Sequence, residues 1–119
     1  MKQRKPYLKQ VIVINDDLKM SPGKIASQAA HAAVGAAFNT ARADAVQDWM
    51  HAPTKIVLRA SARQMLGVIK RAKRRGVRVY KFVDAAPTTE NTENKMTALA
   101  IGPLMSNKFA NITGHLELY

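Results

Sequence analysis

The chain has 119 residues, a length typical of one domain, and its 47% hydrophobic and 23% charged residues are an ordinary globular composition. It contains no cysteine, which excludes a disulfide framework and a thiol nucleophile. Nineteen lysine and arginine residues face eight acidic residues, and the net charge of +11 favours a polyanionic partner over a basic protein with no nucleic-acid role.

Residues 1–7 form a basic lead-in to one domain, which we place at residues 8–119. The lead-in lacks the apolar core of a secretory signal. No apolar run in the chain approaches the roughly 18 residues that a membrane span needs. We therefore expect a cytoplasmic protein with no membrane attachment.

The first two predicted elements are a buried strand and a long helix. The strand covers residues 8–14, because the run from Val11 to Ile14 is continuously apolar. The helix covers about residues 22–39, since Ser21 is a good N-cap and Pro22 suits the first helical position, where no N–H is needed. Lys19 and Lys24 flank its first turn, where free N–H groups and the helix dipole favour anions. We expect a cationic pocket there that can hold a phosphate or stabilise an oxyanion.

Helical spacing places two stripes side by side on this helix. The polar stripe consists of Lys24, Gln28, His31 and Gly35. The apolar stripe, which we expect to pack closely on a sheet, consists of Ile25, Ala29, Ala32 and Ala36. For His31 alone, a buried histidine with satisfied hydrogen bonds is the alternative interpretation.

The rest of the chain alternates between helices and strands. The order predicted is a second helix or kinked extension over 41–50, a strand over 55–60, a helix over 61–75 and a strand over 77–83. A strand over 96–101, a short helix over 106–111 and an edge strand over 116–119 follow. Such alternation predicts an α/β sheet layered with helices.

The helix over 61–75 carries a run of basic side chains. Arg63, Lys70 and Arg74 share one exposed face by helical spacing, and no acidic residue lies between Ala60 and Val83. We interpret this face as a site of phosphate contacts, which position RNA without reading its sequence. A merely solvated helix face is the alternative.

Asp84 follows the predicted third strand, at the kind of sheet edge where α/β sites collect. The polar run over 85–95 is longer than an ordinary connection, which favours a binding loop. Asp84 can orient a water molecule, and a cap or a surface acid is the alternative. Lys19 follows the first strand, so in a parallel arrangement Lys19 and Asp84 lie on the same edge of the sheet and can meet there. The histidines at 31, 51 and 115 are not at metal-ligand spacing, so we expect no metal and no cofactor.

Several motifs in order resemble a known family. The run DLKM-SPGK-IASQAAHAAVG resembles the signature of the archaeal and eukaryotic peptidyl-tRNA hydrolases, the second of two unrelated types of this enzyme. Leu99-Ala100-Ile101-Gly102-Pro103 resembles the family's LGIGP, and Ile112-Thr113-Gly114-His115-Leu116 resembles its VTGHL. The chain departs from the family pattern at Ser21-Pro22, in place of a Gly-Lys pair, and at Ala86, Pro87 and Thr89, in place of Gly, Arg and Gln.

This resemblance implies a three-layer α/β/α sandwich on a small mixed sheet of about four strands. It implies hydrolysis of the ester between peptide and tRNA, with peptidyl-tRNA as the partner, and it suggests a homodimer. The catalytic group it implies consists of Lys19, Asp84, Thr88 and Thr97, with His31 nearby. The tRNA-binding residues we expect are Lys24, Gln28, Arg63, Lys70 and Arg74.

Two further functions stay open at this point. The altered loop at 86–89 favours a non-catalytic module of the same fold that binds tRNA or another RNA. A protein-interaction domain without RNA ranks last, because it leaves the charge of +11 unexplained.

Overall fold

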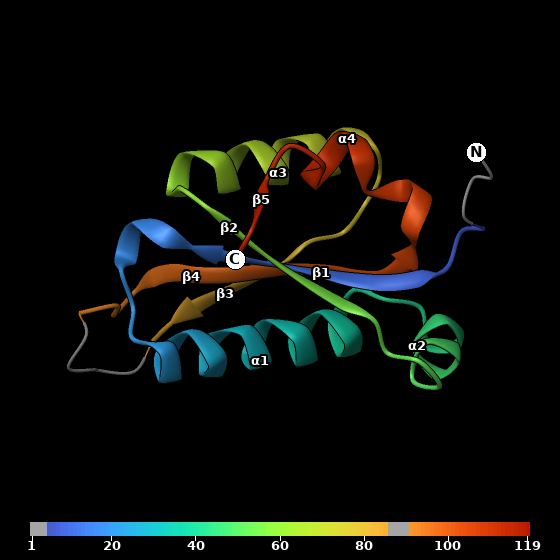
Figure 1. Ribbon diagram of the computed structural model, residues 1–119, viewed down its shortest axis with the longest axis horizontal. Coiled ribbons are helices and arrows are strands. Elements are labelled where there is room, and N and C mark those ends of the chain that lie inside the picture. The colour runs from blue at the N-terminus through green and yellow to red at the C-terminus, as the bar shows by residue number, and fades with distance from the viewer. Residues whose placement is uncertain (1–4, 86–90) are drawn as a thin grey trace.

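The computed structural model describes residues 5–85 and 91–119. In this part of the chain, a five-stranded mixed sheet lies between helices on both faces (Figure 1). The strands are β1 (Leu8–Asn15), β2 (Lys55–Ala60), β3 (Tyr80–Asp84), β4 (Lys95–Met105) and β5 (Glu117–Leu118). The helices are α1 (Pro22–Asn39), α2 (Ala43–Trp49), α3 (Ala62–Arg74) and α4 (Ala110–Thr113), with 3-10 turns η1 (Asp16–Leu18) and η2 (Ser106–Lys108).

The sheet has the order β3-β4-β1-β2-β5, with β1 at its centre. β1 runs parallel to β2 and antiparallel to β4, and β3 and β5 pair antiparallel with β4 and β2. α1 and α2 lie on one face, and α3 and α4 lie on the other (Figure 1). This arrangement confirms the predicted three-layer α/β/α sandwich. β5 pairs with β2 at the sheet edge and confirms the edge strand predicted over 116–119, so the sheet has one strand more than the resemblance implies.

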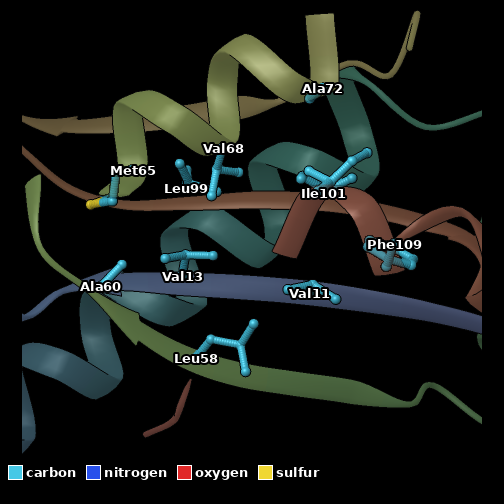
Figure 2. Close-up of a cluster of buried hydrophobic side chains, with 11 residues drawn as sticks. Val11, Val13, Leu58, Ala60, Met65, Val68, Ala72, Leu99, Ile101 and Phe109 are labelled. Carbon is cyan, nitrogen blue, oxygen red and sulfur yellow. The ribbon is translucent and has the colours of Figure 1, made fainter. Parts of the chain in front are cut away.

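β1 is apolar on both faces because it lies between the two helical layers. Val11 and Val13 belong to the core on the α3 side, where Met65 is fully buried (Figure 2). Ile12 and Ile14 belong to the core on the α1 side. The continuous apolar run in the sequence is thus explained by burial from two directions.

The apolar stripe of α1 packs closely on the sheet, as predicted. Ala32 and Ala36 have no exposed surface, while Ile25 and Ala29 are partly buried against the same core. Gly35 lies so close to the ring of Tyr80 that any Cβ at this position would overlap the ring. Small residues therefore set the short distance between α1 and the sheet.

α2 is a separate helix and not an extension of α1. The N–H groups of Thr40 and Ala41 both donate to the carbonyl of Ala36, which ends α1. In the short helix that follows, Trp49 is buried, and its indole N–H donates to the carbonyl of Thr54 at 2.9 Å. The indole bond ties the end of α2 to the start of β2.

The helix predicted over 61–75 is present as α3. The hydroxyl of Ser61 accepts from the N–H of Gln64, and the Gln64 side chain accepts from the N–H of Ser61, which makes a capping box. Gly76 has a φ of 67°, as a glycine after a helix C-terminus commonly has. β3 begins at Tyr80 and not at residue 77, because the N–H of Val77 still donates to the carbonyl of Ala72 in α3.

β4 continues past the end predicted at residue 101 and includes Pro103. A proline removes one ladder N–H, which normally ends a central strand. Here the pairing of β4 with β1 shifts its register between Lys9 and Val11, so the ladder is already interrupted opposite Pro103. The helix predicted over 106–111 appears as η2 followed by α4.

We predict that Ala32→Leu destabilises the fold by about 1–3 kcal/mol, because the added methyl groups have no space between α1 and the sheet. Ala26→Leu, the same substitution on the exposed side of α1, is the control and should change the free energy of unfolding by about 0.5 kcal/mol or less. Urea denaturation measures both. Equal midpoints for the two variants would contradict the close packing of this helix.

Candidate active site

The carboxyl ends of three strands meet at one edge of the sheet. β1 and β2 are parallel, and β3 points the same way because both β1 and β3 run antiparallel to β4. The first turn of α1 and the last residue of β3, Asp84, therefore lie at this edge. The prediction that the chain after β1 and the end of β3 share an edge is confirmed.

A buried ion pair joins α1 to the end of β3. The ammonium of Lys24 lies 2.7 Å from Oδ2 of Asp84, and the two side chains are only 14% and 7% exposed. The hydroxyl of Thr92, which is fully buried, donates to the same carboxylate oxygen at 2.6 Å. An ion pair out of water needs such additional hydrogen bonds to offset the loss of hydration.

Lys19 does not meet Asp84, which corrects our expectation. Its ammonium lies 3.6 Å from Asp16 Oδ2, and its side chain is 78% exposed. The reason is local: η1 ends with Lys19 in the left-handed region, at φ 51°, and the side chain leaves the edge toward solvent. Lys24, in the first turn of α1, takes the place beside Asp84 that we expected for Lys19.

One turn further along α1, Gln28 contacts β4. The hydroxyl of Thr97 donates to Oε1 of Gln28 at 2.5 Å, and both side chains are buried. No other residue in the described part of the chain accepts a hydrogen bond from the Gln28 amide nitrogen. The two N–H donors of this amide therefore have no acceptor among the described residues.

His31 is neither buried nor in contact with Asp84. Its ring stacks on the ring of Phe82, with the centroids 4.7 Å apart and the planes 13° from parallel, and the residue is exposed. The interpretation of His31 as a core histidine is therefore wrong. The polar stripe of α1 nonetheless faces one surface throughout: its four residues contact Asp84, Thr97, Phe82 and Tyr80 in turn.

Comparison with known proteins assigns the chain to a family. The model of the family described as Peptidyl-tRNA hydrolase PTH2 matches residues 8–119. The chain belongs to this family. It is 40% identical to a peptidyl-tRNA hydrolase of Staphylothermus marinus over 119 residues, which cover 97% of this chain and 98% of that protein. It is 38% identical to one of Methanopyrus kandleri, over 92% of this chain and 97% of the relative.

Other relatives extend the comparison. The human mitochondrial peptidyl-tRNA hydrolase 2 is 33% identical over 93% of this chain and 64% of its own length. A solved structure of a protein of unknown function from Agrobacterium tumefaciens superposes with a TM-score of 0.62 over 93% of this chain and 96% of that one. At 9% identity this last likeness shows the fold alone.

The site residues we expected in a peptidyl-tRNA hydrolase fall into separate groups. Lys24 and Gln28, expected to bind tRNA, lie with Asp84 and Thr97 on the α1 side of the sheet. Thr88 lies outside the described residues. α3 lies on the opposite face of the sheet (Figure 1). The basic set on this helix consists of Arg63, Lys70 and Arg74, all exposed.

Arg71 belongs to the same basic run but has a structural contact. Its guanidinium donates to the carbonyl of Ile112 at 3.0 Å and lies 3.0 Å from the ring of His115. Partial burial, together with the charge of Arg71, lowers the pKa of His115. Arg71 thus holds α4 against α3 and is not available for RNA.

Two residues of the site were missed in the sequence. Thr92 is one of many polar residues in a long loop, and nothing in its spacing marks it as the partner of Asp84. Phe82 alternates with Tyr80 on the α1 face of β3, and this period of two was the available signal. Among residues 5–85 and 91–119, no three metal-binding side chains come together, and no helix is long and apolar enough to cross a membrane.

We predict that Lys24→Ala destabilises the fold by about 3 kcal/mol, because it leaves the Asp84 carboxylate buried without its ammonium. Lys19→Ala is the matched control: its exposed pair with Asp16 contributes at most about 0.5 kcal/mol. Denaturant titration at neutral pH measures both values. A larger loss for Lys19→Ala than for Lys24→Ala would contradict the described pairing.

Proposed function

We propose that this chain hydrolyses the ester bond between peptide and tRNA in peptidyl-tRNA, and that the group formed by Lys24, Gln28, Asp84 and Thr97 carries the reaction. The observation that supports this group is the buried Lys24–Asp84 pair at the sheet edge, one turn of α1 from the Gln28 amide, whose N–H donors have no acceptor among the described residues. The membership of the chain in the peptidyl-tRNA hydrolase family supports the substrate and the reaction.

Ester hydrolysis needs a positioned water and a donor for the oxyanion. We assign the water to Asp84, whose carboxylate is fixed in place by Lys24 and Thr92. The water oxygen attacks the peptide carbonyl carbon, and the carbonyl oxygen becomes an oxyanion. The attacking water loses one proton to Asp84. When the tetrahedral intermediate collapses, the bond to the ribose oxygen breaks and Asp84 passes this proton to the ribose oxygen. The peptide leaves as a carboxylate, and the second water proton is released to solvent.

We assign the stabilisation of the oxyanion to N–H donors of Lys24 and Gln28. An ammonium has three N–H donors. One of those of Lys24 donates to Oδ2 of Asp84, with the nitrogen and the oxygen 2.7 Å apart. The Gln28 amide is held by Thr97, so its N–H groups are fixed before the substrate binds. Donors that are already oriented need no reorganisation when charge forms, which makes them effective in the transition state.

We propose supporting roles for Lys19 and Thr88, two further residues of the expected catalytic group. Lys19 is exposed to solvent, and in this proposal its charge meets the phosphate next to the reacting ribose. For Thr88, we propose that the hydroxyl places the ribose. We propose that the enzyme works in the cytoplasm. The expected homodimer stays a prediction, to be checked by light scattering of the purified protein.

Incubation of the protein with an N-acetylated aminoacyl-tRNA tests the function directly. We predict release of free tRNA and acetylated amino acid by the parent protein. Asp84→Asn should slow release about 10²–10³-fold, because the amide cannot fix the water as the carboxylate does. Its affinity for uncharged tRNA should stay within a few-fold of the parent value.

Two results would contradict this proposal. Parental rates in Asp84→Asn would place the reaction elsewhere. Binding of tRNA by the parent protein without any release would make the chain an RNA-binding module of the same fold.

Exposed lysine and arginine side chains on α3 predict an electrostatic contribution to tRNA affinity. Lys70→Ala with Arg74→Ala should weaken binding and flatten the fall of affinity with salt, because fewer phosphate counterions are released. Lys5→Ala with Lys108→Ala removes the same charge from exposed positions elsewhere and is the control. Equal salt slopes for the two double variants would exclude a specific role for α3.

A further inference from the structure

An exposed apolar groove lies between α1 and the outer strand β3. The side chains that line it come from two adjacent surfaces: Ala30, His31, Val34, Gly35, Phe38 and Asn39 on α1, with Tyr80 and Phe82 on β3. Phe38 is 85% exposed and Val34 is 58% exposed. Large apolar side chains that gather at the surface commonly mark a binding site.

The stacked rings of His31 and Phe82 form one end of this groove. Phe82 is partly buried and packs against the α1-side core, so the pair rests on a fixed support. With the rings 13° from parallel, Phe82 covers one face of the imidazole. Because His31 is exposed, its other face is open to solvent and offers a flat surface for a third ring.

The groove and the reaction group both include residues of α1 and β3. Lys24 and His31 lie on the same face of α1, and the seven residue steps from one to the other correspond to roughly 10 Å along the helix. The ribose that carries the ester also carries the last base of the tRNA. A base therefore has to lie within one nucleotide of the carbonyl that reacts at Asp84.

We propose that the open face of His31 stacks with the terminal base at the single-stranded 3′ end of the tRNA. This inference rests on the proposed function. Aromatic faces bind unpaired bases by stacking, without reading their identity. None of the residues that line the described groove is acidic, so the RNA backbone meets no repulsion there.

The terminal base of the tRNA is a better occupant of the groove than the peptide is. Peptides differ in side chains from one substrate to the next, whereas tRNAs share their 3′-terminal nucleotides. A rigid pair of parallel rings suits a planar partner that is always the same. Phe38, two turns beyond His31 on α1, gives the preceding base a second ring.

The test uses two short single-stranded RNAs that carry the tRNA 3′-terminal sequence without any peptide. One is complete, and the other lacks its terminal base. His31→Ala should weaken binding of the complete RNA about 10-fold, as expected for the loss of one stacked base. The two proteins should bind the abasic RNA equally. His31→Phe, which keeps a flat ring, should bind the complete RNA as the parent does.

Hydrolysis of N-acetylated aminoacyl-tRNA supplies the second measurement. His31→Ala should raise KM about 10-fold and leave kcat within about 2-fold, because stacking holds the substrate before and during reaction alike. His51→Ala, at an exposed histidine outside the groove, is the control and should change neither RNA binding nor kinetics.

Three results would overturn the proposal. They are equal affinity of the parent and His31→Ala for the complete RNA, an equal loss on both RNAs, and a defect that grows with the size of the side chain next to the ester. The last result would place the peptide in the groove. Because RNA binding is measured without hydrolysis, a parent protein that is inactive but shows the base-dependent loss would refute the proposed function alone.

Discussion

The close approach of α1 to the sheet is the constraint on which the candidate site depends. Ala32 and Ala36 are fully buried, and Gly35 leaves no room for a side chain beside Tyr80. With the helix this near to β3 and β4, the polar stripe next to these small residues reaches the strands directly. A lysine, a glutamine and a histidine then each contact a different strand residue.

The charges of Lys24 and Asp84 are almost completely removed from water. Two charges out of water are stable only with good geometry and further hydrogen bonds, which Thr92 provides here. A hydrophobic pair of similar size commonly serves the fold as well as a buried ion pair does. The placement of this pair at the sheet edge, one turn of α1 from the donors of Gln28, is therefore better explained by reaction chemistry than by stability.

The sheet also separates two tasks. α1 and α3 lie on opposite faces of the sheet (Figure 1). The reaction group and the aromatic groove include residues of α1, while α3 carries exposed basic side chains. In our proposal the 3′ end of the tRNA follows α1, and long-range attraction comes from the charge of the whole chain, +11. Phosphate contacts on α3 add affinity at a distance from the ester.

Periodic features of this chain could be predicted from its sequence. The two stripes of α1 and the apolar β1 follow from helical and strand spacing, and all are confirmed. The lysine that meets Asp84 could not be predicted in this way, because the left-handed backbone at Lys19 sends its side chain away from the edge. Thr92 lies in a loop without any period, so only the folded chain reveals its bond to Asp84.

A double-mutant cycle on Lys24 and Asp84 tests the central claim most directly. Single-turnover hydrolysis of N-acetylated aminoacyl-tRNA would be measured for Lys24→Met, Asp84→Asn and the double variant, under conditions where all are folded. If the pair acts as one unit, the double variant should be about as slow as the slower single variant. The account would be contradicted if the rate loss of the double variant equalled the product of the two single losses. It would also be contradicted if Lys24→Met reacted at the parental rate.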